Sequence, residues 1–63
     1  MIKVLFNQPV VLFQDDLECE TLFAYVQSIE KLKNGNYMID NDLRNVVHFS
    51  VINDVQFDKQ LAA

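Results

Sequence analysis

The sequence predicts an all-β fold: a small antiparallel barrel or meander of five to six short strands, in a single domain spanning residues 1–63. Two observations support this prediction. Short runs rich in aromatic and β-branched residues recur along the chain, as is typical of strands. Pairs of Asn, Asp and Gly residues separate these runs and are typical of tight turns. These pairs are Asp15-Asp16, Asn34-Gly35, Asn41-Asp42 and Asn53-Asp54.

The N-terminal segment contains two strand candidates. The first is Ile2 to Phe6, where Ile2, Val4 and Phe6 fall on one face. Asn7-Gln8-Pro9 is a break, because proline fixes φ and removes a backbone donor. The second candidate is Val10 to Gln14. We expect the two strands to pair as an antiparallel hairpin across the break.

The segment 17–40 supports two interpretations. Asn34-Gly35 predicts a hairpin turn with positive φ at both positions, flanked by strands. A helix is the alternative, since Asp15 with Glu18 resembles a capping box and Gly35 stands where a helix usually ends. A helical period places on one side Cys19, Leu22, Phe23, Val26, Ile29 and Leu32. The alternative fold class is therefore α+β, a four-stranded antiparallel sheet with one helix at about 17–33.

The C-terminal third predicts strands and turns. Asp40-Asn41-Asp42 is a turn by composition. The longest strand candidate runs from Leu43 to Ile52, with Leu43, Asn45, Val47, Phe49 and Val51 on one face. Asn53-Asp54 is a further turn, and Val55 to Phe57 is a short last strand. Residues 58–63 are expected to fray.

From Ala24 onward, the order of elements resembles small SH3-like barrels at the level of the fold. The resemblance consists of a long bent strand, a Gly turn, a Tyr-x-Ile strand, an acidic turn, a further strand and a short last strand. The residues that carry it are Ala24, Val26, Gly35, Tyr37, Ile39, Val47, Phe49, Asn53-Asp54 and Phe57. The resemblance covers about two-thirds of the chain. It implies a barrel and no particular function, since this architecture serves many functions.

Composition restricts the classes of partner. The net charge of −4 argues against generic binding to nucleic acid or to an anionic membrane, and it suits a partner with a basic surface. Hydrophobic residues make up 51% of the chain, which is more than a monomer of 63 residues can readily bury in its own core. We therefore expect a protein partner, either another copy of the chain or a larger complex. A single cysteine suits a reducing compartment, so a cytoplasmic location is expected.

The sequence predicts no catalytic, cofactor-binding or metal-binding residues. Cys19 and His48 are single residues of their types, and we expect Cys19 to be a small buried hydrophobe and His48 a half-exposed strand residue. Asp40-Asn41-Asp42 resembles the start of a calcium loop. It lacks the glycine at the sixth position, and Val51 stands where a bidentate Glu is required. We therefore expect the protein not to be an enzyme.

An acidic cluster is the main functional candidate. Asp15, Asp16, Glu18 and Glu20 place four carboxylates within six residues. They are typical of a solvated turn, and they also suit an acidic patch that meets a basic partner. The predicted partner-binding residues are these four together with Phe23 and Tyr25.

We therefore expect a small acidic protein-binding module that acts as an accessory subunit or as an inhibitor of a larger protein. A specific version is an inhibitor carried by a phage or mobile element, whose carboxylates replace phosphates on a nucleic-acid-binding defence enzyme. The alternative function is a nucleic-acid-binding SH3-like barrel that stacks bases on Phe23, Tyr25 and Tyr37.

Overall fold

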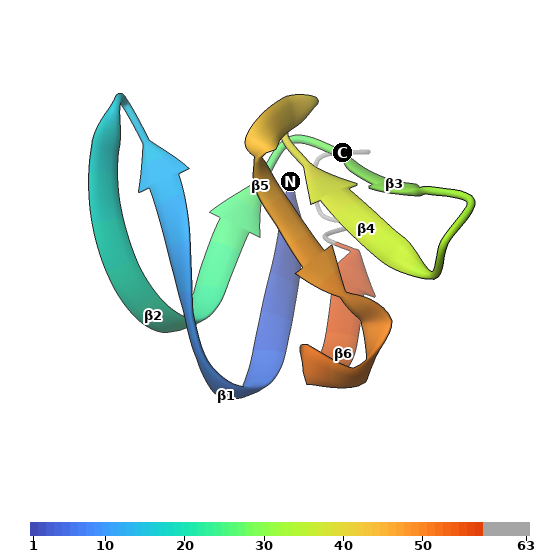
Figure 1. Cartoon of the computed structure of the whole chain (residues 1–63). Coiled ribbons are helices and arrows are strands. Elements are labelled where there is room, and N and C mark those ends of the chain that lie inside the picture. The colour runs from blue at the N-terminus through green and yellow to red at the C-terminus, as the bar shows by residue number, and fades with distance from the viewer. Residues whose placement is uncertain (58–63) are drawn as a thin grey trace, which may run out of the picture.

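The described part of the chain consists of strands and one short 3-10 turn. In the computed structural model, which describes residues 1–57, no residue lies in an α-helix, so the all-β prediction is confirmed and the α+β alternative is wrong. The prediction for residues 58–63 lies outside the described residues. The elements in Figure 1 are β1 (Ile2–Gln14), β2 (Leu17–Val26), β3 (Ile29–Lys31), β4 (Asn36–Ile39), β5 (Asp42–His48), η1 (Phe49–Val51) and β6 (Ile52–Phe57).

The strands form two antiparallel sheets of three strands each. One has the order β2-β1-β6, and the other is a β3-β4-β5 meander. Within residues 1–57 the two sheets do not join into one closed barrel, so the barrel form of the prediction is wrong. The resemblance to SH3-like barrels is not confirmed and stays a prediction.

The segment that supported two interpretations forms β2 and β3 rather than a helix at 17–33. From Phe23 to Val26 exposure alternates: Ala24 and Val26 are buried, whereas Phe23 and Tyr25 are about half exposed. Leu22, which the helical pattern places on the buried side, is 53% exposed. Strand β1 lies alongside and pairs with this segment, and such pairing overrides a local helical pattern.

Strand β1 is continuous, which corrects the expected hairpin across Asn7-Gln8-Pro9. Ile2–Leu5 pairs with the end of β2 on one side and with β6 on the other. After a shift in register, residues 10–14 pair with the start of β2. Pro9 lies in this irregular stretch, where the missing N–H costs no ladder hydrogen bond.

The expected long strand Leu43–Ile52 is interrupted at Phe49. Strand β5 ends at His48, η1 follows, and β6 begins at Ile52, so Asn53-Asp54 belongs to a strand and not to a turn. The His48 side chain explains the interruption, because Nδ1 accepts a hydrogen bond from the Ser50 backbone N–H at 3.2 Å. This bond satisfies a donor at the start of η1, as an N-cap does.

Two of the turns place two successive residues at positive φ. Asp15 and Asp16 have φ values of 52° and 62°, and Asp40 and Asn41 have 57° and 54°. Asn and Asp tolerate this region better than other non-glycine residues. The Asn34-Gly35 prediction is correct for a turn but wrong for positive φ at both positions, because only Gly35 has it, at 85°.

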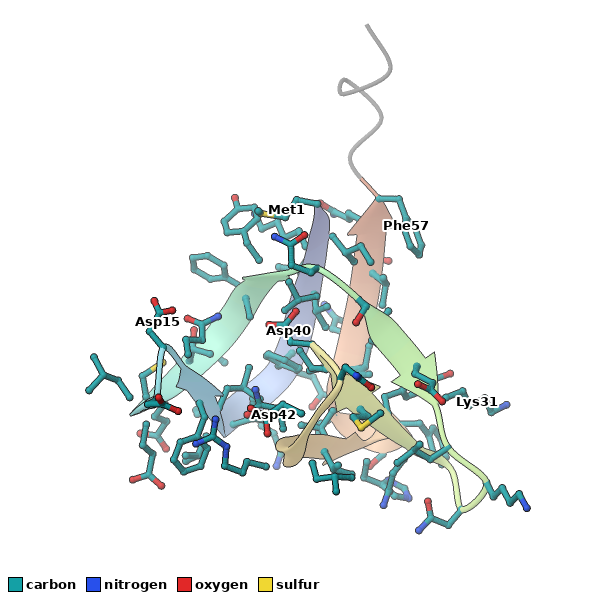
Figure 2. All side chains as sticks on the ribbon, turned by 90° about the horizontal axis from the view of Figure 1, so that it is seen from above. Met1, Asp15, Lys31, Asp40, Asp42 and Phe57 are labelled. Carbon is teal, nitrogen blue, oxygen red and sulfur yellow. The ribbon has the colours of Figure 1, made fainter. Side chains whose placement is uncertain are left out.

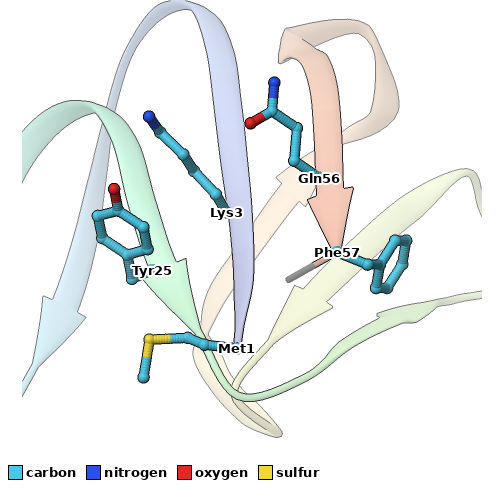
Figure 3. A pocket seen from close by; sticks show the side chains of 5 residues that line it. All are labelled: Met1, Lys3, Tyr25, Gln56 and Phe57. Carbon is cyan, nitrogen blue, oxygen red and sulfur yellow. The ribbon is translucent and has the colours of Figure 1, made fainter. Parts of the chain in front are cut away.

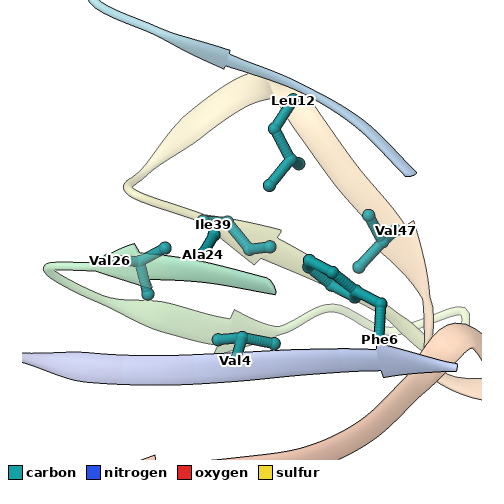
Figure 4. Packing of buried hydrophobic residues seen from close by; sticks show 7 residues of the cluster. All are labelled: Val4, Phe6, Leu12, Ala24, Val26, Ile39 and Val47. Carbon is teal, nitrogen blue, oxygen red and sulfur yellow. The ribbon is translucent and has the colours of Figure 1, made fainter. Parts of the chain in front are cut away.

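The core lies between the two sheets. Figure 4 shows side chains from both sheets that converge there, with Leu12 reaching in from the second half of β1. Its buried apolar members are Val4, Phe6, Leu12, Ala24, Val26, Ile39 and Val47.

A buried amide joins the sheets. Asn45 on β5 is 1% exposed, and its Oδ1 accepts from the Phe13 backbone N–H at 2.7 Å. Its Nδ2 donates to the Phe13 carbonyl at 2.8 Å. The Asn45 side chain thus makes the two backbone hydrogen bonds to Phe13 that a neighbouring strand would otherwise make. Of the residues predicted to share one face of this segment, Asn45 and Val47 are buried, whereas Leu43 and Phe49 are exposed.

Candidate functional site

An acidic groove of about 520 Å³ lies between two turns that are distant in sequence. Asp15 and Asp16 line it from the turn between β1 and β2, and Asp40 and Asp42 line it from the turn between β4 and β5. Figure 2 labels Asp15 at the tip of the hairpin and Asp40 and Asp42 on the other turn. Tyr25 on β2 also lines the groove. Four carboxylates therefore surround one space.

Arg44 is the cation of this groove. Its Nη2 lies 3.2 Å from Asp16 Oδ1 and 2.9 Å from Asp42 Oδ2, and its Nε donates to Asp42 Oδ1 at 3.1 Å. The guanidinium carbon lies 4.7 Å from the centre of the Phe13 ring, a cation–π distance. Hydrogen bonds from Arg44 hold the pKa of the Asp42 carboxyl below its ordinary value, and hydrogen bonds to Asp42 and Asp16 raise the pKa of Arg44.

The other two carboxylates of the groove have no cationic side chain within salt-bridge distance among the described residues. Asp40 Oδ1 accepts the Gln27 backbone N–H at 2.6 Å, and the Asp40 N–H donates to the Ser28 carbonyl at 2.9 Å. The first bond fixes the Asp40 side chain at one wall of the groove, and the second fixes its backbone. Asp15 stands at the tip of the facing turn, so the groove retains net negative charge after Arg44 is counted.

An aromatic surface adjoins the groove through Tyr25. The rings of Phe23 and Tyr25 meet edge to face with centroids 5.9 Å apart, and Lys3 Nζ lies 5.3 Å and 5.6 Å from the two centroids. A shallow hollow of about 340 Å³ continues this surface across β2, β1 and β6. Figure 3 shows Tyr25, Lys3 and Gln56 on these three strands, with Met1 and Phe57 at one end. The surface combines apolar area with one cation.

The structure brings the predicted site residues together only in part. Asp15 and Asp16 line the groove, and Phe23 and Tyr25 form one exposed pair. Glu18 and Glu20 are exposed on β2 opposite Phe13 and Val11, and they do not line the groove.

The site prediction missed Asp40, Asp42 and Arg44. Asp40 and Asp42 belong to the predicted turn 40–42, whose sequence does not fit a calcium loop and which lines the groove. Local sequence contains no sign that this turn faces Asp15, because the two segments lie on different sheets.

Two residues of reactive type lie elsewhere. Cys19 is exposed on β2, which corrects the expectation that it is buried. Cys19 lies opposite Leu12 and so on the same face of the hairpin, but it belongs to β2, an edge strand that here pairs with β1 alone, and the core reaches only as far as Leu12. His48 is exposed, and its Nδ1 lies 2.8 Å from Ser50 Oγ. Within residues 1–57 no group of three or more His, Cys, Asp or Glu side chains is arranged to hold a metal ion.

Comparison with protein-family models, with curated proteins and with solved structures finds no significant match to this chain. Among the described residues no helix has the length and apolar character needed to cross a membrane.

Proposed function

We propose that this chain is a non-catalytic protein-binding module whose acidic groove and adjoining aromatic surface contact a partner with a basic surface. The observation that carries the proposal is the meeting of two distant turns, which surrounds one groove with Asp15, Asp16, Asp40 and Asp42. Tyr25 belongs to both the groove and the aromatic hollow, so one partner surface reaches both.

The two parts of this surface contribute differently to binding. The carboxylates and the net charge of −4 accelerate encounter with a basic partner and favour it over acidic ones. The aromatic pair supplies apolar area, which is the usual source of affinity at an interface. Tyr25 and Phe23 are 55% and 46% exposed, and Met1 and Phe57 beside them are 49% and 63% exposed. A bound partner would remove this apolar area from water.

The proposal includes two roles for such a module, an accessory subunit of a complex or an inhibitor of a larger protein. In the inhibitor form, the carboxylates occupy the positions that phosphates take on a nucleic-acid-binding enzyme. A phage or mobile-element inhibitor of a defence enzyme is the specific version of this role.

The test is capture of a partner from host extract with the full chain, followed by binding measurements with purified variants. Asp15→Asn with Asp16→Asn removes two charges from the groove and keeps a residue type that tolerates positive φ. Glu30→Gln with Asp54→Asn removes two exposed charges at residues that do not line the groove and is the matched control.

We expect the groove variant to slow association with the captured partner at least about tenfold at low salt, and the control variant to leave it nearly unchanged. Tyr25→Ala should accelerate dissociation. Equal binding by the wild type and the groove variant would reject the groove as the contact. A chain that stays monomeric in light scattering and captures nothing would count against the whole proposal.

Nucleic-acid binding is the second candidate, and the position of Lys3 beside two exposed rings is the observation that favours it. Such rings stack on bases, and a nearby cation meets the phosphates. Tyr37, the third predicted ring, is half-buried on the other sheet and packs against the core, so it does not extend this platform. A salt-sensitive shift of single-stranded RNA that Phe23→Ala abolishes would favour this candidate over the first.

A further inference from the structure

The hairpin of β1 and β2 consists of two parts with different support. Near the N-terminus, residues 2–5 of β1 are central in a three-stranded sheet, between β2 and β6. Beyond the register shift, residues 10–14 pair with 17–21 of β2, and the pairing of β1 with β6 has already ended at Phe6. We call residues 10–21 the hairpin arm and the remaining described residues the body. A two-stranded hairpin is marginally stable by itself, so the arm depends on its contacts with the body.

Apolar and polar contacts attach the arm to the body. Leu12 inserts its side chain into the core and is 1% exposed, and the partly buried Val10 packs against the same core. The buried amide of Asn45 holds the Phe13 backbone at 2.7 Å and 2.8 Å. Arg44 on the body pairs with Asp16 at 3.2 Å and covers the Phe13 ring. The Arg44 contact is half exposed to solvent, so salt weakens it.

The irregular stretch 6–9 is suited to be the joint between arm and body. The ladder between β1 and β2 is interrupted there, and the ladder to β6 shifts register between Leu5 and Phe6. Asn7, Gln8 and Pro9 are exposed. Asn7 Nδ2 donates to the Ser50 carbonyl at 2.7 Å, which ties the near side of the joint to the body.

We propose that the hairpin arm opens away from the body as one unit about residues 6–9, and that this opening sets the width of the acidic groove. One wall of the groove, formed by Phe13, Asp15 and Asp16, belongs to the arm. The other wall, formed by Asp40 and Asp42, belongs to the body. In Figure 1 the arm projects to one side of the rest of the molecule, away from β3, β4 and β6, so opening would leave the remaining pairings of both sheets intact. Units with few buried contacts open at lower free energy than the rest of a fold.

Native-state hydrogen exchange on the full chain, followed by NMR at several low urea concentrations, tests this proposal without any partner. Once the arm has left the body its two strands are only marginally stable and their pairing breaks. We therefore expect amides of 10–14 and 17–21 to exchange through an opening with a small urea dependence. Amides of 2–5, 23–26 and 54–57 should require an opening with the full urea dependence of global unfolding. If both groups of amides share one protection factor and one urea slope, the arm does not open separately and the proposal is wrong.

Substitution of Arg44 provides a second measurement. Arg44→Gln should lower the protection of arm amides roughly two- to fivefold, as expected for a half-exposed ion pair, with little change in the body. Raising the NaCl concentration should produce the same effect in the wild type and not in the variant. Lys31→Gln removes one positive charge from an exposed residue of β3 and is the control. Equal loss of protection in arm and body, or no loss in either, would overturn the role of Arg44 as the attachment.

Discussion

Asn45 provides the sharpest test of how the two sheets are joined. Its side chain makes two hydrogen bonds to the backbone of Phe13, and its own burial is nearly complete at 1% exposure. We expect Asn45→Ala to leave the N–H and the carbonyl of Phe13 without partners. It also leaves a small space where a side chain that is 1% exposed is removed.

The magnitude follows from these two bonds. An unpaired buried donor or acceptor costs about 1 to 3 kcal/mol. Because the bonds to Phe13 are only part-buried, water compensates in part, and about 2 to 4 kcal/mol in total is expected. A chain of 63 residues has a free energy of unfolding of only about 3 to 9 kcal/mol. Asn45→Ala should therefore remove much of the stability.

Urea denaturation followed by circular dichroism measures this loss. Asn53→Ala is the matched control, since Asn53 is exposed on a strand and should change stability by less than about 0.5 kcal/mol. If Asn45→Ala costs no more than the control, the amide does not join the sheets and the reasoning is refuted.

Asn45→Asp adds a pH signature to this test. A protonated carboxyl both accepts from the Phe13 N–H and donates to its carbonyl, whereas a carboxylate repels that carbonyl. The folded-state pKa of the introduced carboxyl is therefore raised above its unfolded value. The stabilisation of the fold by the protonated carboxyl is present below about pH 4 and is lost as the pH rises through the raised folded-state pKa. A stability profile of this variant that runs parallel to the wild type would contradict the bonding scheme.

Three further outcomes are expected. Asn41→Gly converts Asp40-Asn41 into the Asp-Gly pair preferred for two successive positive φ values, so it should raise the urea-derived stability by about 0.5 to 1 kcal/mol, and a loss would contradict the turn geometry. Cys19 is exposed, so a thiol reagent should label the folded protein as rapidly as the urea-unfolded protein, and strong protection would show that it is covered. Arg44 lowers the pKa of Asp42, so stabilisation by this pair is present above the ordinary aspartate pKa and is lost as the pH falls through the lowered folded-state value. Arg44→Gln should therefore weaken the dependence of the urea midpoint on pH below about pH 4, and an unchanged dependence would count against the pair.

Most strands and turns follow from local sequence, whereas at 17–33 a helix fits the local pattern as well and pairing of β2 with β1 decides for strand. Asp15-Asp16 and Asp40-Asn41 adopt positive φ because their short polar side chains tolerate it, and this preference acts whatever the rest of the chain does. The Asn53-Asp54 prediction was wrong because the same composition also fits an exposed strand edge. There, pairing with β1 decides the conformation.

Local sequence could also predict that Phe23 and Tyr25 lie on the same side of β2, because side chains of a strand alternate. It could not predict the acidic groove, because Asp15 and Asp40 come within reach of one space only after two hairpins pack together. The role of Asn45 was also not predictable, because alternation places it on the same face as Val47 but does not identify Phe13 as the distant backbone partner of its amide.

Residue types alone determined the strands outside residues 17–33, the places of most turns and the acidic charge. These properties depend on side-chain shape and charge within a few residues. Tertiary structure decided that β1 runs unbroken past Pro9, that Leu22 is exposed while Leu12 is buried, and that two turns meet around Arg44. The physical reason is that each of these features depends on hydrogen bonds or contacts between segments far apart along the chain, whose free energy exceeds the local preference at each position.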